Sequence, residues 1–218
     1  MCARRTDRLA TLRDDILATH PGRRVEVRAL DVVDQDAVFS VFRGFRDDFG
    51  TIDRVFVNAG IGKGAPLGTG RQDVNRETAM TNVIGALAQT EAAMEIFRAQ
   101  ERGHLVMISS MSAVRGLPRS MTTYAASKAA VAHLAEGLGN ELHGTAIKVS
   151  VIYPGYIASE MNDGSASTPL MVSTEKGVAA IVHAVEKGKA VAHVPPLPWA
   201  PLSVVMRHAP LSVFKRLL

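Results

Sequence analysis

Tyr124 and Lys128 are the two residues whose types and spacing most directly suggest chemistry. They lie four positions apart in a stretch whose pattern predicts a helix, so both side chains would share one face of it. An ammonium group beside a phenol favours the phenolate, and we expect it to lower the tyrosine pKa from about 10 toward neutrality. A phenol tuned in this way can exchange a proton with a carbonyl or alcohol oxygen.

Ser110 adds a third group to this pair. It ends the run Val-Met-Ile-Ser-Ser at 106–110, which predicts a buried strand with hydroxyl groups at its end. A hydroxyl there could hydrogen-bond the same oxygen that Tyr124 would protonate. The spacing of Tyr124 and Lys128 alone favours a surface tyrosine and a solvated lysine, but the strand-ending serine favours a catalytic set.

The elements that must position these residues alternate along the chain. Apolar, strand-like runs followed by helical patterns predict a parallel sheet with helices on both faces, the α/β class. The predicted strands span residues 25–32, 52–58, 103–110, 146–153 and 190–194. The predicted helices span residues 34–49, 72–102, 122–143 and 171–187.

The composition is that of an ordinary globular protein. The 218 residues are 47% hydrophobic and 21% charged, which fits one domain over residues 1–218. The net charge of +4 is small and mostly scattered, so we expect no nucleic-acid surface. A single cysteine, Cys2, and no apolar signal segment before Arg4 predict a cytoplasmic protein. The seven histidines lack ligand spacing, so no metal site is expected.

Six motifs in order resemble those of the short-chain dehydrogenase/reductase family. Any one of them is weak evidence, whereas six in the family's order are specific. The resemblance extends from the first residues to about Pro195. The motifs are Arg4-Arg5, Leu30-Asp31-Val32, Val57-Asn58-Ala59-Gly60, Asn82, the set Ser110/Tyr124/Lys128, and Tyr153-Pro154-Gly155-Tyr156-Ile157.

The resemblance implies a role for each catalytic residue. Tyr124 would be the general acid/base, and Lys128 would lower its pKa and bond the nicotinamide ribose. Ser110 would polarise the substrate oxygen; only the family pattern chooses it over Ser109. Asn82 would hold a water molecule in a proton relay, although a satisfied core amide is an equally good interpretation of an asparagine inside a helix.

The resemblance also implies a dinucleotide site. Arg4 and Arg5 follow the family's second strand, where arginine suits a 2′-phosphate, so NADP(H) is expected over NAD(H). The alternative for them is a frayed basic N-terminus. Asp31 would flank the adenine, unless it belongs to the N-cap region of the next helix. The other expected contacts are Val32, Asn58, Ala59, Gly60, Tyr124, Lys128, Pro154, Gly155, Ile157 and Ser159, with Ser159 in place of the usual threonine.

The start of the chain departs from the family pattern. A Rossmann-type, doubly wound sheet opens with a strand, a glycine-rich turn that holds the pyrophosphate, and a helix. Residues 1–5 resemble the end of the second strand, so we expect a sheet that lacks its first βα unit. The strands at 25–32 and 52–58 would then have no common neighbour. We expect the natural product to begin about thirty residues upstream, with such a unit.

These residues predict an NADP(H)-dependent oxidoreductase that interconverts a carbonyl and an alcohol by hydride transfer. A small-molecule substrate and a homo-oligomer follow from the resemblance. The alternative is a catalytically incompetent family member that acts as a binding or interaction scaffold, because the pyrophosphate turn is missing. Residues 160–173 are small and polar, which predicts either a lid over the substrate or an ordinary surface loop.

The C-terminal segment, residues 195–218, is apolar and rich in proline. Its prolines, and the short length of the uncharged run 190–206, argue against a membrane-spanning helix. Trp199 and several aliphatic residues flanked by Arg207 and Lys215 leave three interpretations. The segment could make weak contact with a membrane surface, cap an apolar substrate pocket, or pack on its own domain or a partner subunit.

Overall fold

The computed structural model describes residues 1–162 and 170–214, whose paired strands are parallel throughout and form two sheets. In the first sheet β1 (Cys2–Ala3) pairs with β2 (Arg28–Ala29). In the second sheet the order is β3 (Arg54–Val57), β4 (Gly103–Ile108), β5 (Ile147–Pro154) and β6 (Val191–Val194). Parallel neighbours joined by crossover helices confirm the doubly wound α/β class that the alternating sequence pattern predicts.

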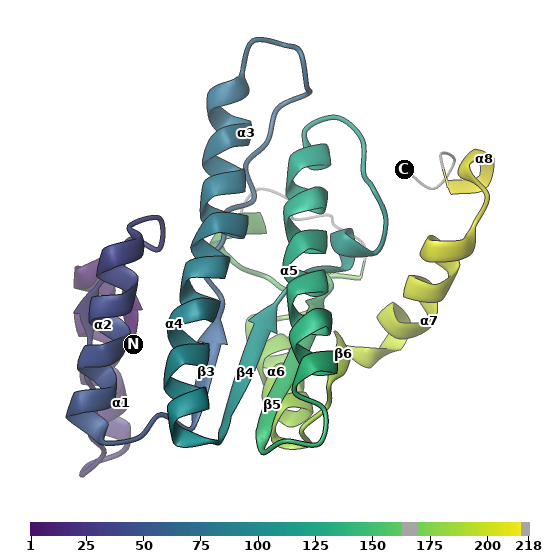
Figure 1. The fold of residues 1–218 in the computed structure, drawn as a ribbon. Coiled ribbons are helices and arrows are strands. Elements are labelled where there is room, and N and C mark those ends of the chain that lie inside the picture. The colour runs from purple at the N-terminus through teal and green to yellow at the C-terminus, as the bar shows by residue number, and fades with distance from the viewer. Residues whose placement is uncertain (163–169, 215–218) are drawn as a thin grey trace.

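Helices cover both faces of the sheets (Figure 1). On one face lie α2 (Gln35–Phe49), α4 (Gly85–Gln100) and α5 (Met121–Glu141), and on the other lie α1 (Thr6–Thr19) and α6 (Thr174–Glu186). The main core lies beneath the first helical layer, and a smaller apolar cluster involves α6. Alternate residues of β4 face the two clusters: Leu105 and Met107 belong to the first, and Val106 to the second.

The two sheets are not hydrogen-bonded to each other, although both contribute to the same core. Cys2 from the first sheet, Leu30 directly after β2 and Val57 from the second sheet belong to one apolar cluster. β1 pairs only with β2, and β3 pairs only with β4. On its other side neither strand has a partner among residues 1–162 and 170–214. Phe56 alternates with Val57 and is 46% exposed, although both faces of a parallel strand are normally covered.

This arrangement confirms one expectation about the missing first unit. The strand within 25–32, β2, pairs with β1, whereas β3 pairs with β4. The strands at 25–32 and 52–58 therefore share no neighbour.

Two predicted elements differ from the structure in extent. The strand expected over residues 25–32 is reduced to β2, two residues long. The helix expected over residues 72–102 consists of α3 (Gln72–Ala79), the π-helical turn η1 (Met80–Ile84) and α4. A π turn adds one residue to a helical turn, which apolar periodicity over a long window does not resolve. The helix α1 is not among the elements predicted from the sequence.

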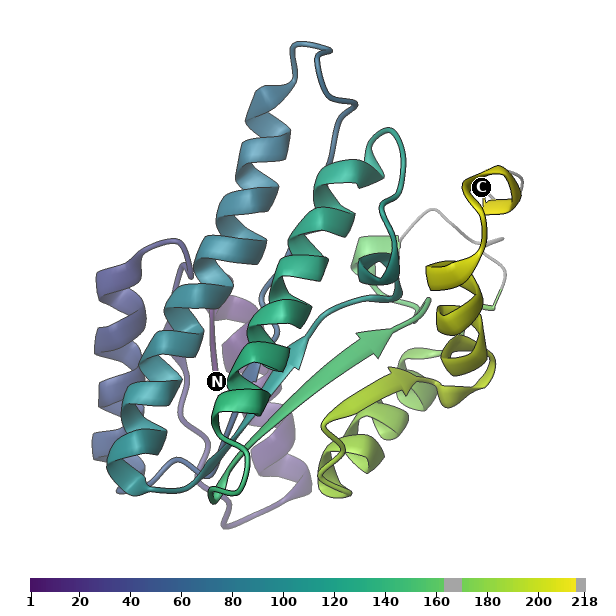
Figure 2. The same cartoon turned by 45° about the vertical axis from the view of Figure 1, so that its right-hand side comes forward.

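The C-terminal part continues from β6 into α7 (Pro196–His208) and α8 (Leu211–Phe214). Figure 2 shows α7 beside the end of β6, on the side of the sheet away from β3. Two short 3₁₀ turns, η2 (Met111–Val114) and η3 (Glu160–Asn162), follow β4 and β5. No helix in the described ranges is both long and apolar enough to cross a membrane.

Candidate active site

The predicted site residues gather at one edge of the larger sheet. Because its strands are parallel, their carboxyl ends meet at the same edge, where doubly wound sheets bind ligands. The strands end at Val57, Ile108, Pro154 and Val194. Asn58, Ala59 and Gly60 follow β3, Ser110 follows β4, and the 154–159 motif begins at the end of β5.

The Ser110 hydroxyl interacts with the Tyr124 phenol and lowers its pKa. Tyr124 lies in the first turn of α5, and Ser110 is the N-cap of η2. The Ser110 Oγ accepts hydrogen bonds from the Ser112 backbone N–H at 3.1 Å and from the Ser112 hydroxyl at 2.9 Å. A serine oxygen has two lone pairs and one proton, so Ser112 fills both acceptor positions. The Ser110 proton is thereby left for Tyr124 or for an oxygen placed beside it.

Ser112 is a residue of this site that sequence reasoning missed. A serine two positions after another serine at the end of a strand is the pattern of a local hydroxyl-to-backbone turn, and this was the only signal in the sequence. Its effect is to orient the hydroxyl of Ser110.

Ser109 and Ser110 have different environments. The Ser109 hydroxyl is 2% exposed and donates to the Lys128 carbonyl oxygen at 2.7 Å, which ties the end of β4 to α5. The Ser110 hydroxyl instead contacts Tyr124. The geometry therefore supplies a physical reason for choosing Ser110 that the sequence lacked.

Lys128 is buried one helical turn from Tyr124. Its Nζ donates to the Ile108 carbonyl oxygen at 3.0 Å, and burial lowers the pKa of Lys128 to about 8. Burial raises the pKa of Tyr124, and the hydrogen bond from Ser110 offsets part of this rise. The expectation that Lys128 brings the pKa of Tyr124 toward neutrality is therefore wrong for this structure, because desolvation of the phenol is the larger effect.

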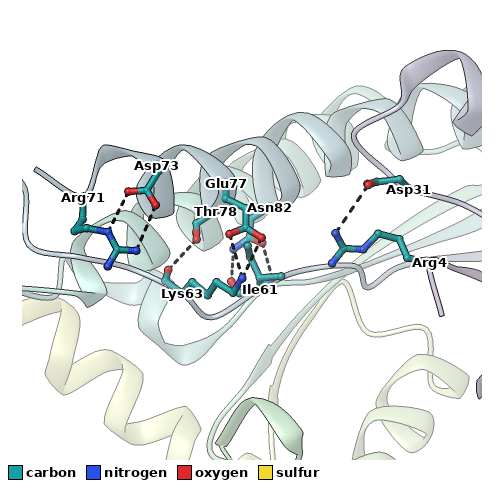
Figure 3. Close-up of polar contacts among 9 residues, drawn as sticks. All are labelled: Arg4, Asp31, Ile61, Lys63, Arg71, Asp73, Glu77, Thr78 and Asn82. Carbon is teal, nitrogen blue, oxygen red and sulfur yellow. Dashed lines mark hydrogen bonds and ion pairs between the residues drawn. The ribbon is translucent and has the colours of Figure 1, made fainter.

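Asn82 belongs to a row of polar side chains that fasten the loop after β3 to the helix beside it. Asn75, Thr78 and Asn82 share one helical stripe, and they bond to Ala65, Lys63 and Ile61 respectively. Figure 3 shows the Thr78 and Asn82 bonds. The three helix residues are three and four positions apart, and the three loop residues that they bond are two positions apart. Each step along the helix therefore reaches the next inward-facing residue of the extended loop. This matching of periods explains why a helix interior contains these polar residues.

The amide of Asn82 is almost fully engaged. Its Oδ1 accepts from the Ile61 N–H at 2.8 Å, while Nδ2 donates to the Ile61 carbonyl at 2.9 Å and to the Ser127 hydroxyl at 3.0 Å. These bonds use both amide protons, which favours the core-amide interpretation. A Cβ on Gly60 would lie 3.2 Å from Lys128 Nζ and 3.3 Å from Asn82 Oδ1, so the three residues meet at this point.

Replacing Asn82 with Ala is expected to lower the free energy of unfolding by about 2–4 kcal/mol, because the Ile61 N–H and C=O lose their partners in a buried place. Denaturant unfolding measures this loss. Asn75→Ala is the matched control: Asn75 bonds both backbone groups of Ala65 but is partly exposed, so water can replace it and the loss is expected to be smaller. Equal losses for the two variants would contradict a special role for the buried amide.

The residues expected at the adenosine end lie around the first sheet. Arg4 Nη1 is 3.9 Å from Asp31 Oδ2 (Figure 3), and the other Asp31 oxygen accepts from the Val33 N–H at 3.1 Å. The N-cap of α2 is Asp34, whose side chain accepts from Ala37, so the N-cap alternative for Asp31 does not hold. Val32 packs against α4 at Gly85, where a Cβ would lie 2.7 Å from its methyl group.

Arg5 and Arg8 share one carboxylate. Arg5 Nη1 donates to one oxygen of Glu160 at 2.9 Å, and Arg8 bonds the other. These two bonds lower the pKa of Glu160. Arg8 was not predicted from the sequence; its only signal was its position three residues after Arg5. Glu160 begins the segment expected to form a lid, of which residues 163–169 lie outside the described part.

The 154–159 motif contacts the C-terminal segment. A Cβ on Gly155 would lie 2.0 Å from the Trp199 ring, so only glycine permits this packing, and Tyr156 meets the same ring edge-on at 5.6 Å. Ile157 bridges to Val172, and Ser159 is exposed. Trp199 and Phe214 are each 4% exposed, so the aromatic part of residues 195–214 packs on its own chain. Residues 215–218 lie outside the described part.

A family model described as short chain dehydrogenase matches residues 1–170. The chain is also similar to an uncharacterized oxidoreductase of Mycobacterium tuberculosis (strain ATCC 25618 / H37Rv). The two are 47% identical over 216 residues, which cover 99% of this chain and 85% of the relative.

Solved structures share the fold. The closed form of serine dehydrogenase complexed with NADP+ matches with a TM-score of 0.76 and 23% identity, covering 89% of this chain and 83% of that one. A short chain dehydrogenase/reductase from Burkholderia phymatum in complex with NAD matches with a TM-score of 0.82 and 19% identity. That match covers 97% of this chain and 84% of the other.

Proposed function

The chain belongs to the short-chain dehydrogenase family and is an oxidoreductase, and on that premise we propose that it interconverts a carbonyl and an alcohol on a small molecule, with Tyr124 as the general acid/base. The observation that carries this proposal is the interaction of the Ser110 hydroxyl with the Tyr124 phenol, one helical turn from Lys128. A bound nicotinamide cofactor supplies or accepts the hydride.

Tyr124 and Ser110 have different roles in the transfer of the proton. In the reductive direction the phenol of Tyr124 donates its proton to the carbonyl oxygen, which becomes a hydroxyl, and a phenolate remains. The single Ser110 proton can be donated to the substrate oxygen, where it stabilises the developing charge, or to the phenolate. A raised pKa keeps Tyr124 protonated near neutral pH, the form that donation requires.

The pH dependence follows from the direction of this shift. Oxidation of an alcohol needs the phenolate of Tyr124, whose population grows as pH rises toward its raised pKa. We therefore expect the oxidation rate to increase with pH above neutrality, while reduction is favoured at neutral pH.

We further propose NADP(H) as the cofactor. Arg4, Arg5 and Arg8 place guanidinium groups around the start of α1, and guanidinium suits a phosphate monoester. At the other end, Gly60 leaves space beside Lys128, whose ammonium can donate to a ribose hydroxyl. The fold neighbours are complexed with NADP+ in one case and with NAD in another, so the charge at the adenosine end is what favours NADP(H).

The family also supports the substrate class and the assembly that we propose. A small carbonyl or alcohol as substrate and a homo-oligomer as the assembly are usual for the family. The scaffold alternative is disfavoured, because Ser110, Tyr124 and Lys128 are all present and meet at the ligand-binding edge.

The double variant Arg4→Ala, Arg5→Ala is expected to weaken NADPH binding by about tenfold or more, since a hydrogen bond to a charged group contributes about 1.5–3 kcal/mol. NADH binding should not change, because NADH has no 2′-phosphate. Calorimetric titration with each cofactor measures both affinities. Arg13→Ala is the control, since Arg13 lies on α1 and pairs only with the adjacent Asp14. Equal losses for NADPH and NADH would show that these arginines do not read the phosphate.

A further inference from the structure

Arg115 connects the loop that bears Ser110 to the C-terminal segment. Its guanidinium Nη1 donates to the Met206 carbonyl oxygen at 2.9 Å and also bonds the Ala209 carbonyl. The same guanidinium lies over the Phe214 ring, with Cζ 4.7 Å from the ring centroid. Arg115 thus makes three contacts with a part of the chain about ninety residues away.

The position of these carbonyl groups explains why an arginine is suited to them. Met206 lies in the last turn of α7, and Ala209 is the C-cap residue. The last carbonyls of a helix have no partner within it and form the negative end of the helix dipole. A cation that bonds them holds the end of α7 in place.

Ser110 and Arg115 are the two ends of one tight turn. Ser110 is the N-cap of η2 and Arg115 is its C-cap, while Met111 and Ser112 between them are buried. A short turn with buried side chains moves as a unit, so a shift at Arg115 is transmitted to the hydroxyl of Ser110.

The C-terminal segment also contacts the second loop of the site. Trp199, in the first turns of α7, fills the space above Gly155 and meets Tyr156. The residues 196–214 therefore touch both the loop after β4 and the loop after β5 (Figure 2).

We propose that residues 196–214 form a strap that sets the position of the Ser110 hydroxyl, with Arg115 as the positioning residue that joins the strap to the loop. This inference rests on the proposed function, because the exact placement of Ser110 matters to turnover only if Ser110 acts on the reacting oxygen. Neither the family resemblance nor the sequence pattern assigns a role to Arg115.

The test uses the titration of Tyr124, which requires no substrate. Tyrosinate absorbance is followed against pH, and the Tyr124 component is assigned by difference from Tyr124→Phe, since the chain has two other tyrosines, Tyr153 and Tyr156. Ser110 lowers the pKa of Tyr124 through its hydrogen bond. Arg115→Ala, by releasing the turn, is expected to raise the pKa of Tyr124 further, and Arg115→Lys should restore part of the difference. Arg119→Ala, an exposed arginine in the same loop, should change nothing.

Turnover supplies the second measurement. With a carbonyl substrate found by screening, Arg115→Ala is expected to reduce kcat by about 10–100-fold, the range that a displacement of about 1 Å can cause, while the cofactor Kd stays within about twofold. An unchanged Tyr124 titration together with a lower unfolding temperature would overturn the proposal, because Arg115 would then only cap α7.

Phe214→Leu and Tyr124→Phe distinguish a failure of the strap from a failure of the proposed function. Phe214→Leu retains apolar bulk and removes the aromatic ring beneath the guanidinium, so it tests the strap if Arg115→Ala does not fold. It should shift the Tyr124 titration in the same direction by less, and no shift would count against the strap. If Arg115→Ala shifts the titration while Tyr124→Phe retains full turnover, the strap stands and the proposed function fails.

Discussion

Tyr124→Phe is expected to reduce turnover by about 10²–10⁴-fold, the usual contribution of a general acid or base. The substitution removes the phenol proton that interacts with Ser110, and it leaves the half-buried ring in place. Cofactor affinity should change little, because the phenol oxygen is expected to act on the substrate. Steady-state kinetics and cofactor titration separate the two effects.

Tyr153→Phe is the matched control for this variant. Tyr153 is also partly buried, with a pKa that burial raises, but it stacks on His193 at 5.2 Å and does not contact Ser110. Its loss of the same hydroxyl should leave turnover within about twofold, because no catalytic role is proposed for Tyr153. If Tyr124→Phe kept more than about a tenth of the parent rate, Tyr124 would not be the acid/base.

Lys128→Met is expected to have two opposite effects, a loss of activity and a gain in stability. The side chain is 5% exposed, and burial lowers its pKa from 10.5 to about 8. A shift of this size corresponds to about 3 kcal/mol of cost for keeping the ammonium inside the folded protein. The bond from this ammonium to the Ile108 carbonyl, worth about 1.5–3 kcal/mol because the donor is charged, is lost in the variant. The free energy of unfolding should therefore rise by up to about 1.5 kcal/mol near neutral pH.

The gain should disappear at alkaline pH. Between about pH 8 and 10.5 the unfolded chain still binds the Lys128 proton while the folded chain has released it. The stability of the parent therefore increases across this interval, and its penalty is full only below about pH 8. Denaturant unfolding at a series of pH values follows the difference between parent and variant. A loss of stability in Lys128→Met at neutral pH would show that the ammonium contributes more through its bonds than its burial costs.

The activity of Lys128→Met should fall because the neutral thioether cannot donate a hydrogen bond to a ribose hydroxyl. Lys148→Met is the control, since Lys148 lies on the exposed side of β5. A variant that is more stable but inactive would show that the buried ammonium is maintained for function at the expense of stability.

The sequence predicted the features that depend on short-range spacing. Alternating apolar strands and helices gave the doubly wound class, because burial on both faces of a parallel sheet requires continuous apolar runs. The four-residue spacing of Tyr124 and Lys128 placed them on one helix face, and Ser110 was placed by the end of its strand. The break in the sheet was also foreseen, since the structure forms two sheets in which β2 and β3 share no neighbour.

Only the tertiary structure decided the features that depend on burial and on distant segments. The pKa of Tyr124 is raised because folding buries its phenol, an effect that the neighbouring lysine in the sequence does not reveal. Ser109 and Ser110 look alike in sequence and differ only in what their hydroxyls reach. Arg115 acquires its partners from residues about ninety positions later, after β6 has brought α7 back beside η2. Local spacing is fixed by the chain itself, whereas solvent exclusion and long-range contacts exist only once the chain has folded.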